Sequence, residues 1–131
     1  MIEANNLFAQ LPDHIPAEIT EILLKSRGFR LERIVSGGQA TPAGQWYDQD
    51  THEWVLLLTG SAGLRFQGVA EIKVMGPGDY LNIPAHCRHR VEWTDPDQKT
   101  VWLALHYRTA IGFAPGRRGV KGRNTLRPQA A

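Results

Sequence analysis

Residues 76–94 read GPGDYLNIPAHCRHRVEWT, and this stretch alternates turn residues with short strand patterns. Residues 76–79 predict a turn, because glycine, proline and aspartate favour turn conformations. Residues 80–83 have the length of a short strand, and Pro84 ends it because proline cannot donate to a β-ladder. A second alternating pattern begins at His89. The stretch therefore predicts two short strands joined by a compact loop, as in an all-β protein.

The same pattern extends along the chain in both directions. Residues 19–26 and 29–36 predict a β-hairpin, although the first run could instead form a helical turn after Pro16. Helix is scarce, with candidates only at residues 5–10 and 16–24. Short strands separated by turn residues are typical of an all-β sandwich or barrel. Further strands are expected at residues 53–59, 64–66, 72–74, 89–93 and 100–107.

The size and composition fit one soluble domain. The chain has 131 residues, of which 42% are hydrophobic and 21% charged. Its longest apolar run, residues 54–58, is far shorter than the roughly 18 residues of a membrane-spanning helix. The N-terminus, MIEANNLFAQ, lacks the basic and apolar segments of a secretory signal. Cys87 is the only cysteine and cannot form an internal disulfide, so we expect a cytoplasmic protein.

Charge divides the chain into a barrel with an N-terminal arm, residues 1–107, and a basic extension, residues 108–131. The extension has six basic residues and no acidic ones, whereas the barrel has nine basic residues against 13 acidic ones. A basic tail can bind nucleic acid or a partner protein. It lacks interleaved aromatic residues, however, so we favour a solvated extension that lies on the acidic body of its own or a neighbouring subunit.

The strand predicted at residues 53–59 is largely apolar on both faces. Glu53 and every second residue after it share one face, and Trp54 and every second residue after it share the other. An antiparallel strand with one solvated side would alternate apolar and polar residues. The outer face is therefore expected to be covered, either by the N-terminal segment or by a second subunit, and we predict a homodimer.

Two stretches resemble the two motifs of the cupin family. The first motif is a Gly, then His-x-His, three or four residues, Glu, six residues and Gly. Glu53 and Gly60 match its second half, and Gly44 lies near the leading Gly. The second motif is a Gly, five residues, Pro-x-Gly, two residues, His, three residues and Asn. Gly78, Pro84 and His89 follow that spacing.

The sequence departs from the family's pattern at the positions that bind metal. Tyr47 and Gln49 occupy the places of the His-x-His pair if three residues precede Glu53, and Trp46 and Asp48 occupy them if four do. In the second motif, His86 replaces Gly and Trp93 replaces Asn. The resemblance, over about residues 30–107, implies a small single-domain cupin, which is a double-stranded β-helix or jelly-roll barrel.

Glu53 and His89 are the candidate catalytic residues. A carboxylate in an apolar interior needs a cation or several donors, so Glu53 is a metal ligand, a general base, or a group satisfied by arginine or backbone donors. His89 shares its face with Val91 and Trp93, which places it inside the barrel as a ligand, a proton shuttle or a core histidine. We predict Gln49, Glu53 and His89 as a sparse site for a divalent metal such as Fe, Mn, Ni or Zn. Tyr47 and Trp93 are predicted to contact the bound ligand.

The remaining polar candidates are weaker. His52 and Asp48 are expected at the surface, unless a bulge before the strand redirects His52. His86 stands where the motif has Gly and is expected to serve a turn at positive φ. Cys87 has no assignable base and is expected to be structural. His106 is a secondary candidate whose strand face, inside or outside, the sequence leaves open.

Three functions compete at this stage. The first is a metal-dependent enzyme on a small organic substrate, as a dioxygenase, isomerase or decarboxylase, which are activities that occur among cupins. The second is a module that binds or senses a small ligand without metal or catalysis. The third depends on the basic tail recruiting nucleic acid or a partner. Fold alone does not choose among them, because function resides in the site.

Overall fold

The computed structural model describes residues 1–109, and within them the protein is entirely β-structure without helix. No helix in this range has the length and apolar character needed to cross a membrane. The basic extension lies outside the described residues from position 110 onward. The described strands are β1 (Ile19–Ser26), β2 (Phe29–Ser36), β3 (His52–Thr59), β4 (Ala62–Phe66), β5 (Lys73–Met75), β6 (Tyr80–Ile83), β7 (His89–Thr94) and β8 (Thr100–Tyr107).

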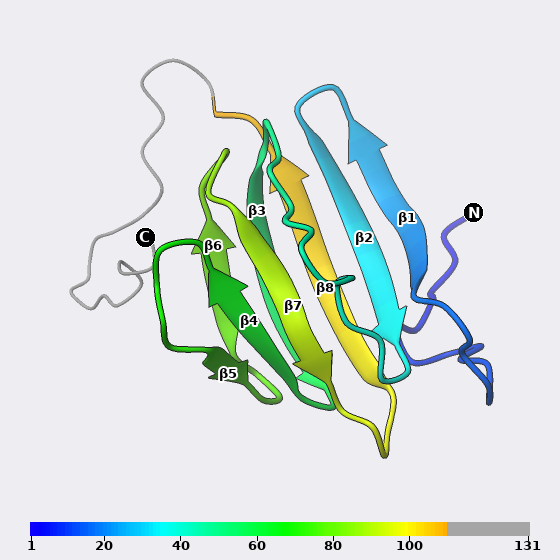
Figure 1. The fold of residues 1–131 in the computed structure, drawn as a ribbon. Coiled ribbons are helices and arrows are strands. Elements are labelled where there is room, and N and C mark those ends of the chain that lie inside the picture. The colour runs from blue at the N-terminus through cyan, green and yellow to red at the C-terminus, as the bar shows by residue number, and fades with distance from the viewer. Residues whose placement is uncertain (110–131) are drawn as a thin grey trace.

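The strands form two antiparallel sheets that face each other (Figure 1). The first sheet has the order β1-β2-β8-β3-β6, and the second has the order β5-β4-β7. All strand pairs are antiparallel. Strands distant in sequence therefore meet, since β8 lies between β2 and β3. The all-β prediction and the hairpin predicted at residues 19–36 are confirmed.

The core lies between the sheets and follows the predicted alternation. On β3, Glu53, Val55 and Leu57 are buried, whereas Trp54 and Leu56 are only half-buried. Apolar side chains from both sheets meet this inner face, and their burial at about 25 cal/mol per Å² supplies the main stabilisation of the barrel. The buried core consists of Val55, Leu57, Ala62, Leu64, Phe66, Met75, Leu81, Ile83, Trp102 and Ala104.

The N-terminal arm covers part of the outside of the five-stranded sheet. Arg33 of β2 donates hydrogen bonds to the carbonyl oxygens of Leu7 and Ala9, at 2.9 and 2.8 Å. The possible helices at residues 5–10 and 16–24 are wrong: residues 7–10 form a turn, and β1 begins at Ile19. Pairing with β2 favours the extended form, which β-branched residues prefer.

A long loop between β2 and β3 closes the barrel beside β7. Tyr47 and His89 exchange two backbone hydrogen bonds, with N–O distances of 2.7 and 3.1 Å. The Arg90 guanidinium donates to three carbonyl oxygens of this loop, those of Thr41, Pro42 and Gln45. The loop is therefore held as an additional strand-like edge that brings Tyr47 to the cavity.

A β-bulge in β7 changes the predicted position of Trp93. Leu64 pairs with Val91, but Gly63 pairs with Trp93, so β7 has one extra residue at this point. The bulge breaks the alternation that was expected to carry Trp93 to the His89 face. The Trp93 indole instead lies over Gly63, where an added Cβ would come within 2.3 Å of its Nε1. Trp93 is thus on the outer side of its sheet, and its predicted place in the ligand pocket is wrong.

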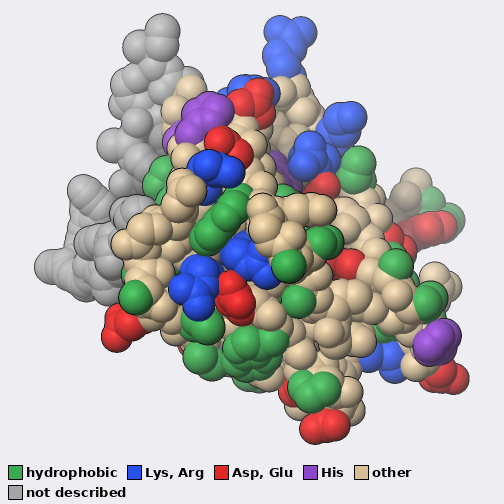
Figure 2. Space-filling model, viewed as in Figure 1, with side chains coloured by type: hydrophobic (Ala, Val, Ile, Leu, Met, Phe, Trp, Pro, Cys, Tyr) green, Lys and Arg blue, Asp and Glu red, His purple; other side chains and the backbone are tan. Residues whose placement is uncertain are grey.

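The two outer faces differ in character. The three-stranded sheet shows basic and acidic side chains next to one another (Figure 2), including Arg65 and Arg90, which both contact Glu92 at 2.9 Å. The five-stranded sheet instead carries half-buried apolar side chains that are cross-strand neighbours. This outer apolar face consists of Leu31, Trp54, Leu56, Leu103 and Leu105.

Candidate active site

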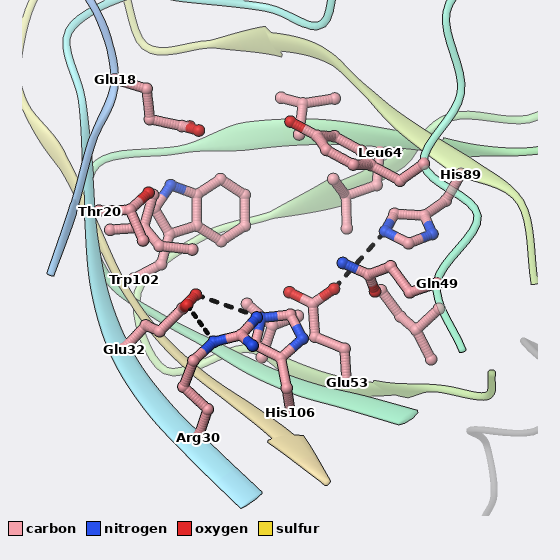
Figure 3. Close-up of a pocket in the computed structure, with 15 residues that line it drawn as sticks. Glu18, Thr20, Arg30, Glu32, Gln49, Glu53, Leu64, His89, Trp102 and His106 are labelled. Atoms are coloured by element: carbon pink, nitrogen blue, oxygen red, sulfur yellow. Dashed lines mark hydrogen bonds and ion pairs between the residues drawn. The ribbon is translucent and has the colours of Figure 1, made fainter. Parts of the chain in front are cut away.

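A cavity of about 190 Å³ opens between the two sheets (Figure 3). Its walls combine apolar core residues with an unusual number of charged groups. The apolar part is made by Ile34, Val55, Leu64, Ile83, Val91 and Trp102. The polar part is made by Glu18, Thr20, Arg30, Glu32, Tyr47, Gln49, Glu53, His89 and His106.

Glu53 and His89 meet across the cavity from different sheets. Glu53 belongs to β3 and His89 to β7, and the two side chains are 8% and 5% exposed. His89 Nε2 lies 3.6 Å from Glu53 Oε1 (Figure 3). The His89 ring is stacked against Tyr47, with ring centroids 5.6 Å apart, and tilted against Phe66 at 6.0 Å. The imidazole is therefore held between two aromatic rings and directed at the carboxylate.

The surroundings of His89 fix which nitrogen faces the cavity. Its Nδ1 lies 2.9 Å from the carbonyl oxygen of Cys87, and a carbonyl can only accept, so Nδ1 carries a hydrogen. A neutral His89 therefore presents the lone pair of Nε2 to Glu53, and an ionised Glu53 presents another lone pair in return. Two acceptors facing each other at 3.6 Å are stabilised when a proton is shared between them. The geometry therefore places a carboxylate oxygen and an imidazole nitrogen side by side in the cavity.

A second carboxylate–imidazole pair lies on the inner face of the five-stranded sheet. His106 Nε2 is 3.2 Å from Glu32 Oε1, and Arg30 Nε is 2.5 Å from Glu32 Oε2 (Figure 3). His106 is directly opposite Arg30 on one side and Glu53 on the other. Its Nδ1 is the only buried side-chain nitrogen or oxygen of residues 1–109 that has no hydrogen-bond partner. The open question about the His106 strand face is thus answered: it faces the interior.

Glu18 and Tyr47 lie at the mouth of the cavity, where both are exposed to solvent. The pKa of the Glu18 carboxyl is raised, mainly by desolvation and to a smaller extent by the charge of Glu53. A hydrogen bond from Ser36 acts in the opposite direction and lowers it. The pKa of Tyr47 is raised, first by desolvation and then by the charges of Glu18 and Glu53. The Tyr47 phenol is therefore protonated at neutral pH.

The predicted site residues divide into those inside the cavity and those outside it. Tyr47, Gln49, Glu53 and His89 all line the cavity, and Trp93 does not. Trp102, from β8, supplies the tryptophan wall instead and donates from its Nε1 to Ser36 Oγ at 3.3 Å.

The remaining candidates lie away from the cavity. His52 accepts a hydrogen bond from the backbone N–H of Ala85 and packs against Tyr107. His86 adopts φ 64°, as expected for its turn, and contacts Asp48 at 2.9 Å. Cys87 is partly buried, and desolvation raises the pKa of its thiol, which disfavours the reactive thiolate.

Three charged residues of the site escaped the sequence analysis. Arg30, Glu32 and Ile34 are spaced two residues apart along β2. This spacing already placed their side chains on one face of the strand. That pattern did not say which face was inside. Glu18 directly precedes β1 and has no motif around it, so only the folded chain brings it to the cavity.

The donor set does not fit the metal centre that the resemblance implies, which needs three histidines and one glutamate. Within residues 1–109, no three His, Cys, Asp or Glu side chains are grouped so that they could hold a metal ion. The two missing histidines are replaced by the phenol of Tyr47 and the neutral amide of Gln49, which are weaker ligands. That Gln49, Glu53 and His89 together bind a divalent metal remains a prediction.

Comparison with known proteins found a solved structure with high sequence identity and several others with a similar fold. No protein-family model matches the chain, and no curated protein matches its sequence. A solved structure from Ralstonia eutropha JMP134, provisionally named as a mannose-6-phosphate isomerase, is 50% identical. The match covers 82% of this chain and 100% of the relative, with a TM-score of 0.80.

Two solved structures with lower sequence identity are named as cupins. A cupin superfamily protein from Desulfitobacterium hafniense DCB-2 is 16% identical, with 74% of this chain and 83% of that chain covered and a TM-score of 0.61. A cupin family protein with a double-stranded β-helix fold, from Methanocaldococcus jannaschii, is 14% identical, with 82% and 92% covered and a TM-score of 0.60. These likenesses confirm the predicted double-stranded β-helix.

Proposed function

This chain belongs to the cupin superfamily, and from that premise we propose that it is a small-molecule isomerase that moves protons on a hydroxy-carbonyl compound bound in the cavity. One observation carries the proposal. Glu53 and His89 come from different sheets, are both buried, and face each other at 3.6 Å inside the cavity. A carboxylate and an imidazole in this arrangement form a general acid–base pair.

The chemistry needs only proton movement. Interconversion of an aldose and a ketose moves one proton between adjacent carbons and one between their oxygens, with no net oxidation. Glu53 would take the proton from the carbon beside the carbonyl and return it to the neighbouring carbon. His89 would supply and recover the proton at the oxygens through Nε2, since its Nδ1 is occupied by the Cys87 carbonyl. The aromatic contacts of His89 would hold the ring in place during both transfers.

The relative from Ralstonia eutropha supports the reaction class. Its provisional name describes a sugar-phosphate isomerase, and half of the aligned residues are identical. A non-catalytic module that binds a small ligand in the same cavity is the alternative, and it predicts binding without proton exchange. The two differ in one measurable quantity, the rate at which bound ligand exchanges carbon-bound hydrogen with solvent.

Solvent-deuterium exchange followed by NMR tests the proposal. The purified protein, treated with chelator, is incubated in D₂O with mannose, fructose and the 6-phosphates of both. The proposal expects deuterium at the carbon beside the carbonyl of at least one of them. Glu53→Gln and His89→Asn should each slow this exchange by about 10²–10⁴-fold, the usual share of general acid–base catalysis.

Glu71→Gln is the matched control, because Glu71 is exposed and lies outside the cavity. It should exchange at the wild-type rate. Wild-type protein that adds no deuterium to any of the four compounds would contradict the isomerase. Exchange that survives in both cavity variants would contradict the assignment of Glu53 and His89.

A further inference from the structure

We propose that the ligand of this cavity is a hydroxyl-rich molecule without an anionic group, and that Glu18 enforces this choice at the mouth. The inference rests on the proposed function for the cavity and the Glu53–His89 pair, and it adds the class of ligand. It departs from the phosphorylated sugar in the name of the relative from Ralstonia eutropha.

The charges that line the cavity are unfavourable for an anion. Three carboxylates line it, those of Glu18, Glu32 and Glu53, against one arginine, Arg30. The Arg30 guanidinium is already paired with Glu32 at 2.5 Å. No lysine or second arginine is present among the lining residues to neutralise Glu18 and Glu53. A phosphate ester carries a charge of about −1.5 to −2 at neutral pH and would meet uncompensated negative charge.

The hydrogen-bonding character of the cavity leads to the same ligand class. An ionised carboxylate only accepts hydrogen bonds, and neutral His89 presents the lone pair of Nε2 because Nδ1 donates to the Cys87 carbonyl. Glu18 and the Glu53–His89 pair, which shares a single proton, therefore offer more acceptors than donors and require donors from the ligand. Hydroxyl groups donate, whereas an ionised phosphate mainly accepts. The hydroxyl groups of a polyol or an unphosphorylated sugar can donate hydrogen bonds to these acceptors.

Glu18 is placed where an entering ligand passes. It is an exposed lining residue, as are Thr20 and Tyr47, so these three residues mark the opening. Figure 3 shows the Glu18 carboxylate on the opposite side of the cavity from His89 and Gln49. Ser36 Oγ donates to Glu18 Oε2 at 2.9 Å and fixes its orientation. The pKa of Glu18 is raised, first by desolvation and to a smaller extent by the charge of Glu53, against the hydrogen bond from Ser36 that lowers it.

The size of the cavity favours a small ligand as well. Its volume is about 190 Å³, whereas pockets for drug-sized ligands are roughly 300–1,000 Å³. A charged substituent on the ligand would thus extend toward the mouth and toward Glu18.

Titration of the full-length protein tests the ligand class directly. The probes are unphosphorylated aldoses, ketoses and polyols of three to six carbons, each paired with its phosphate ester. Binding is read by calorimetry and by the imidazole NMR signals of His89 and His106, which report from inside the cavity. At least one neutral compound should bind, and the affinity of its phosphate ester should be lower by about tenfold or more. Glu18→Gln should narrow the ratio between the two affinities, and Glu71→Gln should leave it unchanged.

The outcomes separate this inference from the proposed function. A phosphate ester that binds as tightly as its neutral counterpart, or absence of binding by every neutral member, would overturn the inference. A neutral aldose or ketose that binds without exchanging the hydrogen beside its carbonyl would support the inference and contradict the isomerase, whereas a polyol reports on binding alone. Deuterium exchange on phosphate esters alone would support the isomerase and overturn the inference.

Discussion

The inner and outer faces of the five-stranded sheet reverse the usual distribution of charge. Its inner face carries Arg30, His106 and Glu53 at adjacent positions across three strands. Its outer face carries neighbouring apolar pairs from the same strands, such as Leu56 with Leu103. Burying charges costs free energy unless they are paired, and exposing apolar surface forgoes the gain of burial. The difference is consistent with our proposals of a polar ligand at the inner face and of a covering partner at the outer face.

The two carboxylate–imidazole pairs on the inner side also differ from each other. Glu32 contacts His106 at 3.2 Å and Arg30 at 2.5 Å, so its charge is balanced within the protein. Glu53 contacts His89 at 3.6 Å across two sheets, and no lysine or arginine shares the cavity with it except Arg30. The first pair is suited to holding structure. The second pair is the one to which we assign proton exchange with a ligand.

Removing the Glu32 carboxylate should have the largest effect on stability. Glu32→Ala leaves the buried His106 and the partly exposed Arg30 without their partner, and leaving a buried polar group unpaired costs about 1–3 kcal/mol. Urea unfolding should show this loss, against a change within about 0.5 kcal/mol for Glu71→Ala. A loss no greater than that of the control would mean that the inner charges are not a balanced cluster.

Charging the outer apolar face should have the next largest effect, on association. We expect a homodimer through Leu31, Trp54, Leu56, Leu103 and Leu105, because these side chains form a continuous half-buried patch. Leu56→Glu should weaken the dimer about 30-fold or more, the effect of losing a central interface contact. Val74→Glu, at an exposed position on β5, is the control. Light scattering that finds wild-type monomers at micromolar concentration would refute the dimer.

The smallest expected effect concerns Glu18 and pH. Its pKa is raised in the folded protein above the ordinary value of 4.5, so the folded state holds this proton more tightly than the unfolded state. The stabilisation is present at low pH and is lost as the pH rises through the folded-state pKa. Glu18→Gln should therefore gain stability relative to wild type between acidic and neutral pH, as measured by urea unfolding at each pH. A stability difference that does not change with pH would contradict a raised pKa of Glu18 in the folded protein.

The sequence was sufficient to predict the strands and to place Glu53 on β3 and His89 on β7 facing the interior. Alternation along β3 places Glu53 with Val55 and Leu57, and that pattern depends only on local geometry. Trp93 was misplaced because a β-bulge arises from pairing with β4, which a single strand does not reveal.

Other parts of the site depended on contacts between distant segments. Glu18 reaches the cavity only because β1 pairs with β2, and Glu32 meets His106 only because β8 inserts between β2 and β3. Charged residues occur on both faces of β2, where Arg33 points outward and Glu32 inward, so alternation did not identify the inner side. Tertiary pairing, and not local preference, completes the polar lining.

A double-mutant cycle in the deuterium-exchange assay tests most directly whether Glu53 and His89 act as one unit. The rates of wild type, Glu53→Gln, His89→Asn and the double variant are compared on the same ligand. Groups that share one proton are strongly non-additive, so the double variant should be slowed no more than the slower single variant. Losses that multiply in the double variant would show that the two residues act independently and would contradict the account of the site.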